Sequence, residues 1–288
     1  MAPNYSAIVR TWNSEKTLAK TLCSLRIQTR PPKEVIVVDS GSSDGTMAMA
    51  GHFGARILKY PPDFAFNYSK ALNIGIAAAA TECVLPVSSH TVMPYKDTAK
   101  QMLDALVRPG TVGVYCVPTW RGSDEAPQKR QGAARLVEID RATFDGYNGL
   151  WNNCSLFRKS DWAVHLFDET MWTAEDQEWA WWHIRNGGRK TARLEGTGTM
   201  DLNPGRSQWK AAREHVAIAS RCYPNYYKWR TILGRFVNSG CALVSFKRRM
   251  FKRELLFGCV LALHRAGLLK FQSQYHAGPP RWLSWLAR

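Results

Sequence analysis

The fold class of this chain is decided by the stretch Val35-Ile-Val-Val-Asp39-Ser-Gly-Ser-Ser-Asp-Gly-Thr46. Its β-branched apolar run is typical of a buried parallel strand. The run ends in an acid, Asp39, and a polar turn with Gly41 and Gly45 leads into a helix-like segment from Met47. Open α/β sheets bind ligands just outside the carboxyl ends of their strands. An acid at that point favours contact with a ribose or a base and disfavours a bare phosphate.

The stretch contains neither of the two common phosphate-binding patterns. Gly-x-x-x-x-Gly-Lys and Gly-x-Gly-x-x-Gly are both missing from it. Turn or helix-cap chemistry accounts for Asp44 better than ligand contact does. We therefore expect Asp39 and the adjacent Ser40 to contact a ligand, while residues 42–46 mostly build the turn.

Strand-like and helix-like segments alternate over the first two thirds of the chain. Strands are expected at 5–10, 35–38, 55–60, 83–87 and 112–117, and helices at 17–26, 67–80, 97–107, 162–167 and 176–186. This alternation predicts an α/β, Rossmann-like fold with a mostly parallel sheet covered by helices on both faces. The long polar segment 120–149 is expected to be an irregular loop.

The positive charge is concentrated at the C-terminal end. Residues 206–288 carry 16 Lys and Arg against two acids, whereas the first 205 residues are close to neutral. The sequence therefore predicts a domain at 1–205 and a basic helical extension at 206–288. Such an extension requires an anionic partner: lipid headgroups, nucleic acid or a phosphorylated acceptor.

The extension has the composition of an amphipathic membrane-surface segment. Its densest apolar stretch, 255–263, is short, because a spanning helix needs about 20 apolar residues. Lys and Arg precede this stretch, and Trp282 and Trp285 lie near the end, a pattern that favours association with an anionic membrane surface. The alternatives are a helical cap on the first domain and a nucleic-acid-binding face.

Two further features bear on the compartment. The seven cysteines contain no Cys-x-x-Cys pair, which argues against a zinc knuckle and a disulfide framework. No export signal follows Met1. We therefore expect a cytoplasmic protein that is peripheral on the inner face of the cytoplasmic membrane.

Polar side chains recur at residues 11–14, 39–44, 88–90 and 173–178. The first three sites follow predicted parallel strands and should open on one edge of the sheet. At the fourth, Glu175 and Asp176 precede a helix, whose dipole stabilises an ionised carboxylate. An ionised carboxylate can act as a general base. The alternative is a helix start with capping acids.

Together these motifs resemble the family 2 inverting glycosyltransferases, which have the GT-A fold. The similar segments are Ile8–Asn13, Val38–Thr46, Phe66–Gly75 and Glu175–Asp176 with Trp179, within about residues 5–200. The closest similarity is to the rhamnosyltransferase-like group of cell-envelope polysaccharide synthesis. The resemblance implies a nucleotide-sugar donor and a single displacement that inverts the configuration at the anomeric carbon.

The resemblance also implies roles for individual residues. Asp176 would be the catalytic base, and the acceptor would be bound by Trp151, Glu175 and Trp179. The nucleotide sugar would be bound by Thr11, Asn13, Asp39, Ser40, Lys70, Ser88 and Ser89. Lys70 has the alternative role of a surface lysine, and each tryptophan that of a core residue.

The chain departs from the family where a metal would bind. The Asp-x-Asp motif of the family falls at Ser88-Ser89-His90. The resemblance implies a divalent cation, Mn²⁺ or Mg²⁺, with His90 as a ligand and Asp201 as a candidate oxygen donor, although hard cations prefer carboxylates. A lone histidine is more often structural than a ligand.

The predicted function is transfer of a sugar to a hydroxyl of a lipid-linked or cell-envelope saccharide, with no nucleic-acid partner. Two alternatives remain at this point. One is an inactive nucleotide-sugar-binding protein, because the Asp-x-Asp motif is missing. The other is a nucleic-acid-binding protein that uses the basic tail.

Overall fold

The structure is a computed structural model that describes residues 3–121, 134–202, 208–222, 228–245 and 248–269. The chain divides into two compact units. Unit 1 comprises residues 1–169 and 175–205, and unit 2 comprises residues 170–174 and 206–288.

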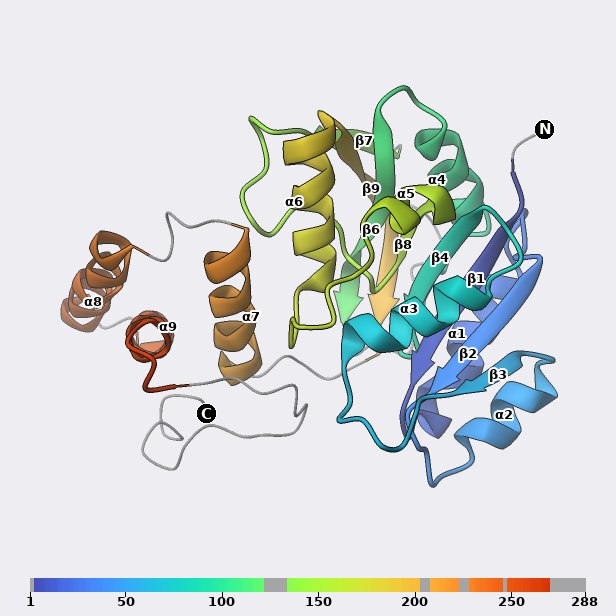
Figure 1. The fold of residues 1–288 in the computed structure, drawn as a ribbon, viewed down its shortest axis with the longest axis horizontal. Coiled ribbons are helices and arrows are strands. Elements are labelled where there is room, and N and C mark those ends of the chain that lie inside the picture. Colours follow the sequence, from blue (N-terminus) through green and yellow to red (C-terminus); the bar gives the residue numbers. More distant parts are fainter. Residues whose placement is uncertain (1–2, 122–133, 203–207, 223–227, 246–247, 270–288) are drawn as a thin grey trace. The chain divides into compact units, whose positions relative to one another are not determined.

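Unit 1 is built on a nine-stranded sheet within the described residues, with the order β3-β2-β1-β4-β8-β6-β9-β5 and β7 paired to β9 (Figure 1). The strands are β1 Tyr5–Thr11, β2 Glu34–Asp39, β3 Arg56–Lys59, β4 Cys83–Ser88, β5 Thr91–Val92, β6 Thr111–Arg121, β7 Arg135–Ile139, β8 Ser155–Arg158 and β9 Lys190–Asp201. Parallel pairings join β3-β2-β1-β4 and β6-β9, whereas β5, β7 and β8 pair antiparallel.

Helices cover both faces of this sheet, which confirms the predicted α/β architecture. They are α1 Glu15–Arg26, α2 Thr46–His52, α3 Tyr68–Ala78, α4 Thr98–Leu106, α5 Lys159–Val164 and α6 Glu175–Gly187. Strand β1 shows why two layers are required, because nearly all of its residues are buried on both faces. Val9 belongs to the core shared with Leu18 and Leu22 of α1, whereas Ile8 points to the opposite side, under α3.

Helix α3 approaches the sheet at a glycine. A Cβ at Gly75 would be placed against Ile8 Cγ2 and 3.0 Å from Val38 Cγ2. The helix begins at an N-cap, Asn67, whose Oδ1 accepts a hydrogen bond from Lys70 N at 2.9 Å. Cap and glycine together fix how the helix lies across β1 and β2.

The segment 120–149 is only partly the irregular loop that its polar composition predicted, since residues 140–149 form turns and bends but two strands occupy other parts of it. Strand β6 runs to Arg121, and β7 forms at Arg135–Ile139 by pairing with β9. Arg135 donates to Glu195 Oε2 across this pair at 2.6 Å. Polar strand residues that pair in the tertiary structure leave a weak signal in the sequence, because their partners lie some 60 residues away. Residues 122–133 of this segment lie outside the described residues.

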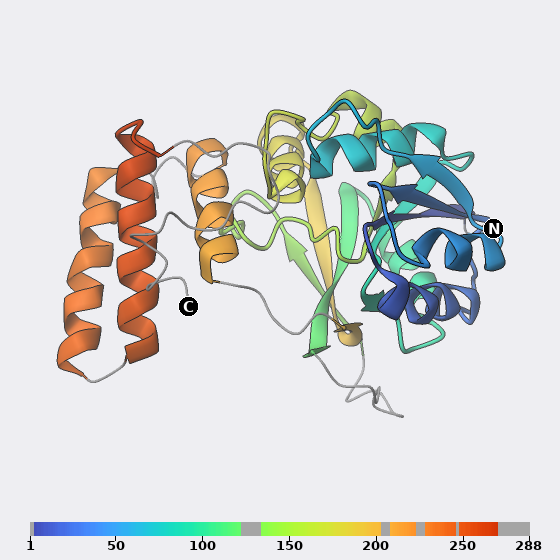
Figure 2. The same cartoon turned by 90° about the horizontal axis from the view of Figure 1, so that it is seen from below.

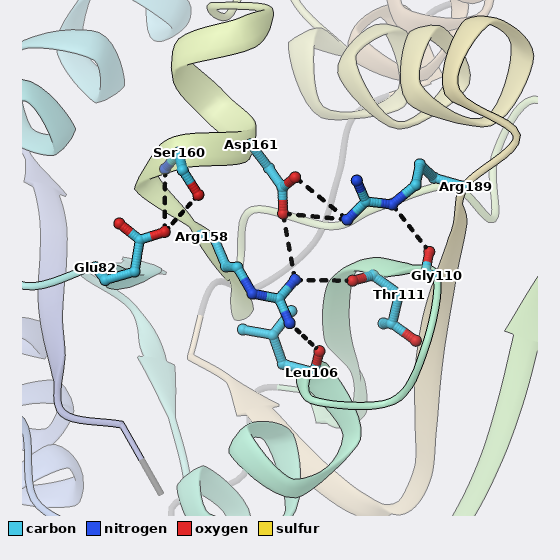
Figure 3. A network of polar contacts seen from close by, with 8 residues as sticks. All are labelled: Glu82, Leu106, Gly110, Thr111, Arg158, Ser160, Asp161 and Arg189. Atoms are coloured by element: carbon cyan, nitrogen blue, oxygen red, sulfur yellow. Dashed lines mark hydrogen bonds and ion pairs between the residues drawn. The ribbon is translucent and has the colours of Figure 1, made fainter.

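A network of polar contacts ties the amino-terminal ends of β4 and β6 to α5 and to the segment after α6 (Figure 3). Arg158 donates to the carbonyls of Leu106 and Thr111 at 2.6 and 3.0 Å. Asp161 accepts from Arg158 and forms an ion pair with Arg189 at 3.2 Å. The network therefore braces the sheet at the edge opposite the carboxyl ends of β1, β2 and β4.

From residue 208 onward, the described residues of unit 2 are mostly helical. Its helices are α7 Gln208–Arg221, α8 Trp229–Val244 and α9 Arg248–Arg265. Figure 2 shows α8 and α9 running side by side, and α7 also packs on α9. The shared core contains Trp209, Val216, Ile232, Leu256 and Val260.

A buried polar cluster lies within this helical core. Glu254 accepts from Arg235 at 2.7 Å and forms a second ion pair with Arg253. Arg235 also contacts His215 Nε2 at 3.2 Å. Burial, assisted by the charge of Arg235, lowers the pKa of His215 to about 3, so this histidine is neutral at physiological pH.

None of the helices in the described parts of the chain has the length and apolar character needed to cross a bilayer.

The close approach of α3 predicts a cost for adding one methyl group. Gly75→Ala should destabilise the protein by about 1–3 kcal/mol, because the core must shift to admit the Cβ. Gly51→Ala is the matched control: it lies in α2, where an added Cβ would enter open space, and it should stabilise the helix slightly. Urea unfolding measures both. Equal stability of Gly75→Ala and the parent chain would contradict this packing.

Candidate functional site

The carboxyl ends of β1, β2 and β4 bring three of the predicted polar sites to one edge of the sheet. Thr11 is in register with Asp39, and Arg10 with Ser88. Ser14 Oγ lies 2.8 Å from Ser89 Oγ, which joins the loop after β1 to the loop after β4. The predicted convergence of these segments is thus present in the structure.

The loops after β1 and β2 are held together by direct hydrogen bonds. Ser43 N donates to Asn13 Oδ1 at 2.8 Å, and Asn13 N donates to Ser42 Oγ at 2.9 Å. Ser14 N donates to Thr46 Oγ1 at 2.7 Å. Asn13 adopts a φ of 46°, a conformation that asparagine tolerates better than most residues. The two loops therefore form one preorganised edge.

Asp39 organises its own loop. Its Oδ2 accepts from the backbone N–H groups of Gly41 and Ser42, both at 3.0 Å, and its Oδ1 accepts from Ser42 Oγ at 2.5 Å. Gly41 has a φ of 91°, which a residue with a side chain rarely adopts. A carboxylate has about four acceptor positions, so one remains for a ligand.

Two hydroxyl groups at this edge lack a protein partner. Thr11 Oγ1 and Ser40 Oγ are buried and make no hydrogen bond within the described residues. Asp44, by contrast, builds the turn, because its Oδ1 accepts from Thr46 N at 3.0 Å. This is the turn role expected for Asp44 from the sequence. Thr11 and Ser40, like Asp39, thus retain hydrogen-bonding capacity that a ligand could satisfy.

His90 follows β4 and lies beside Asp201. The His90 Nε2 atom is 3.7 Å from Asp201 Oδ1. Pairing of β5 with β9 places Thr91 opposite Asp201, and Leu202 N donates to the His90 carbonyl at 2.8 Å. Ser88 N and Oγ contact Asn153 instead. Only the tertiary pairing of β5 and β9 brings the histidine and the carboxylate together.

The His90–Asp201 pair sets limits on a metal site. Across the described ranges, no group of three or more His, Cys, Asp or Glu side chains converges as a metal site. The pair offers one imidazole nitrogen and one carboxylate, whereas Mg²⁺ keeps an octahedral shell. It fits a cation that takes its other ligands from a bound diphosphate and water, and it does not fit a site of protein ligands alone.

The two acids of the fourth site have different surroundings. Asp176, in the first turn of α6, accepts from Asn152 N at 3.0 Å and Gln177 N at 2.8 Å. Glu175 is buried and forms an ion pair with Arg10 NH1 at 3.4 Å. Asn152 Nδ2 also donates to Glu175 Oε1 at 3.4 Å. Both acids contact protein groups, but Glu175 is buried whereas Asp176 is partly exposed, so Asp176 is the acid that a ligand can reach.

Removal from water raises the pKa of Asp176 to about 7, and the negative charge of Glu175 adds to the rise. The N–H groups of Asn152 and Gln177 and the charge of Arg10 act in the opposite direction. A carboxylate with this pKa can take a proton near neutral pH, which is what general-base chemistry requires.

Arg10 and Asn152 are site residues that the sequence analysis did not identify. Arg10 contacts Glu175 and also lies 4.8 Å from the centre of the Tyr68 ring. A charged residue near the end of an otherwise apolar strand was the available signal for Arg10. Nothing in the sequence marks Asn152, whose role depends on the packing of the segment before β8 against α6.

The remaining predicted residues have protein contacts that constrain their roles. Lys70 Nζ lies 3.5 Å from the centre of the Phe64 ring and 3.8 Å from Glu169 Oε2, contacts that favour the surface alternative. Trp151 is half-buried, and its ring stacks with Tyr115.

Trp179 is a correction to the predicted acceptor site. Its side chain is fully buried, and its ring packs against those of Phe157 and Phe167. Helical periodicity turns this residue of α6 toward the sheet, so it is part of the core and offers no surface to a sugar.

Comparison with known proteins identifies the family. Residues 6–164, more than half of the chain, match the family described as Glycosyl transferase family 2. The chain belongs to glycosyl transferase family 2. Membership supports glycosyl transfer as the activity and confirms the family predicted from the motifs. The comparison does not resolve the rhamnosyltransferase-like group, which stays a prediction. No curated protein matches this glycosyltransferase.

Solved structures share the fold of this glycosyltransferase. A mannosyltransferase from Pyrobaculum calidifontis, in complex with GDP-Man and Mn²⁺, has a TM-score of 0.65 at 15% identity, over 92% of this chain and 88% of that chain. TarS 1–349 of S. aureus, in complex with UDP-GlcNAc, has a TM-score of 0.59 at 19% identity, over 92% and 84%. Glucosyl-3-phosphoglycerate synthase of M. tuberculosis has a TM-score of 0.53 at 16% identity, over 76% and 80%. These similarities establish the GT-A fold of the glycosyltransferase.

The charges around Asp176 predict opposite effects for two substitutions. Arg10→Gln should make the Glu175–Asp176 pair take up its first proton at higher pH, because a nearby positive charge is lost. Glu175→Gln should lower the pKa of Asp176, because a negative charge is lost. NMR titration of the two side-chain carboxyls measures both effects without substrate.

Arg10→Lys is the control for this titration, since it keeps the charge and alters only the geometry. If Arg10→Gln and Glu175→Gln both raised, or both lowered, the pH at which the carboxyls take up a proton, the assigned electrostatic effects would be contradicted.

Proposed function

We propose that this glycosyltransferase is an inverting enzyme that moves a hexosyl or deoxyhexosyl group from a nucleotide diphosphate sugar to an acceptor hydroxyl. The acceptor would be a lipid-linked or cell-envelope saccharide, as in the rhamnosyltransferase-like group. The observation that carries the proposal is the Arg10–Glu175 ion pair at 3.4 Å. It joins the residue before Thr11 to the residue before Asp176, so the loop at the sheet edge and the candidate base belong to one site.

The donor would bind at the carboxyl edge of β1, β2 and β4. Asp39, with its remaining acceptor position, would take a hydrogen bond from the nucleoside. The hydroxyls of Thr11 and Ser40 would gain the partners that they lack in the protein. Asn13 would hold the edge in place through its bonds to Ser42 and Ser43.

Asp176 would act as the general base. Its carboxylate takes the proton of the acceptor hydroxyl while the oxygen attacks the anomeric carbon from the face opposite the diphosphate. The bond between the anomeric carbon and the diphosphate oxygen breaks, and the nucleoside diphosphate leaves with the electron pair. One displacement at that carbon inverts its configuration.

A divalent cation, when bound, would neutralise charge that develops on the leaving diphosphate. His90 and Asp201 are the residues that would hold it, with Ser88 and Ser89 at the start of the same loop. Because the protein supplies an incomplete set of metal ligands, the second candidate function is an inactive nucleotide-sugar binder. A turnover measurement distinguishes this binder from an active enzyme.

The basic extension would bring the enzyme to its acceptor. Residues 206–288 carry 16 Lys and Arg against two acids. We propose that unit 2 associates with an anionic membrane surface, where a lipid-linked saccharide would be presented. The enzyme would then act as a peripheral protein on the cytoplasmic face.

Replacement of the base tests the reaction. Asp176→Asn should lower kcat by about 10²–10⁴-fold with little change in donor KM, because general-base assistance is lost while the donor site is intact. Release of the nucleoside diphosphate gives the rate, and NMR of the anomeric proton gives the product configuration. Asp104→Asn in α4 makes the same acid-to-amide change at an exposed position away from this site, and it serves as the control for the loss of a negative charge.

Two results would count against the mechanism. Unchanged turnover in Asp176→Asn would remove Asp176 as the base. Retained configuration in the product would exclude a single displacement. If the parent enzyme turned over no nucleotide sugar and yet bound one, the inactive-binder interpretation would replace the proposed function.

A further inference from the structure

Helix α8 has two apolar faces. One faces α9 and includes Ile232, which is fully buried, and Phe236, which packs against the unit 2 core. The other is exposed and includes Trp229, Leu233 and Val237, which are 48%, 59% and 64% exposed. A helix with one covered face normally presents polar side chains on its other face. The exposed apolar face of α8 therefore requires an explanation.

The exposed residues form a continuous strip. Trp229, Leu233, Val237 and Val244 are separated by four, four and seven positions, and Val244 is 80% exposed. At 3.6 residues per turn, these spacings place all four within about 80° of one another around the helix axis. We call these four residues the α8 strip. Contiguous exposed apolar strips of this kind mark interaction sites.

The surroundings of the α8 strip carry positive charge and almost no negative charge. Between residues 215 and 288 the sequence contains a single acid, Glu254. Glu254 is 4% exposed and is paired with Arg235 and Arg253. Arg230, by contrast, is exposed next to Trp229 in the sequence. A partner for this surface would therefore combine an apolar layer with anionic groups.

One end of the strip has the chemistry of a membrane interface. The Arg265 guanidinium lies 5.5 Å from the centre of the Trp229 ring, in a cation–π arrangement. Trp side chains favour the boundary between headgroups and acyl chains, and Arg at that depth reaches the lipid phosphates. Arg265 stands at the end of α9 and Trp229 at the start of α8, so both helices contribute to this end.

We propose that the α8 strip is the surface by which unit 2 lies on a bilayer containing anionic lipids. The strip would enter the headgroup–acyl boundary, with Arg230 and Arg265 on the lipid phosphates. This inference rests on the membrane association proposed above, and it assigns that association to one helix face.

A second copy of the chain fits this surface less well than a bilayer. A twofold contact through the α8 strips would bring the same basic side chains of both copies together, without acids to pair with them. Like charges opposed across an interface reduce affinity. Anionic headgroups supply the charge that a second copy lacks.

Vesicle binding by the full chain tests the inference. Sucrose-loaded vesicles of phosphatidylcholine, with or without phosphatidylglycerol, are sedimented with the protein. We expect the parent chain to bind the anionic vesicles preferentially and the double variant Leu233→Gln/Val237→Gln to bind them about tenfold or more weakly, because two anchoring side chains become polar.

The matched control is Val107→Gln/Val164→Gln. Val107 and Val164 are 59% and 67% exposed, but they belong to unit 1. This double variant should bind vesicles like the parent chain. All four positions are exposed, so neither double variant should lower the melting temperature appreciably.

An environment-sensitive fluorophore gives a second measurement that keeps the native strip. Cys23 and Cys241 are both exposed cysteines, and Cys241 lies on α8. A probe on Cys241 in a Cys23→Ser background should shift its emission to the blue with anionic vesicles. A probe on Cys23 in a Cys241→Ser background should not.

The outcomes separate the inference from the proposed function. If the parent chain and Leu233→Gln/Val237→Gln bound vesicles equally and the probe on Cys241 did not respond, the α8 strip would not be the membrane surface. Membrane association by another surface would remain. If the parent chain bound no vesicles, both the α8 strip and the membrane association of unit 2 would be overturned. Glycosyl transfer would still be tested separately, by turnover with a water-soluble acceptor. Self-association in the absence of vesicles that is lost in Leu233→Gln/Val237→Gln would assign the strip to a second copy instead.

Discussion

The ion pair between Arg10 and Glu175 is the contact on which the site depends. These residues are 165 positions apart, and the pair connects the end of β1 to the start of α6. It holds Glu175 against the protein and leaves Asp176 as the available acid. Because the positive charge opposes the effects of burial and of Glu175, it also limits how far the pKa of Asp176 rises. The Arg10–Glu175 ion pair therefore affects both the position of the two acids and the pKa of Asp176.

Rigid connections around this pair prepare the sheet edge for a ligand. The loops after β1, β2 and β4 are joined through Asn13, Ser14 and Ser89, and Asp39 fixes its own turn. Gly75 lets α3 lie close to the strands beneath these loops. Preorganised polar groups lower the entropy that binding must overcome. The edge thus pairs satisfied structural bonds with a few unsatisfied hydroxyl groups.

Local patterns in the sequence predicted the parallel half of the sheet and the family, because β-branched runs and strand-end acids are local signals. The same reasoning missed β7, β8 and β9, which form through pairings with strands distant in the sequence and contain no long β-branched run. It singled out Asp176 as the candidate base but did not identify Arg10 or Asn152, whose contacts with the two acids come from packing. It also placed Trp179 beside an acceptor, although helical periodicity turns that ring into the core.

The central claim is that the carboxyl edge of β1, β2 and β4 binds a nucleotide diphosphate sugar. A ligand that binds only the folded protein raises its melting temperature in a concentration-dependent way. A thermal-shift panel of nucleotide sugars, with and without Mn²⁺, tests this most directly. The account predicts that at least one nucleotide sugar raises the melting temperature of the parent chain and has a much smaller effect on Asp39→Ala. If no nucleotide sugar raised the melting temperature of the parent chain, with or without Mn²⁺, the account would be contradicted.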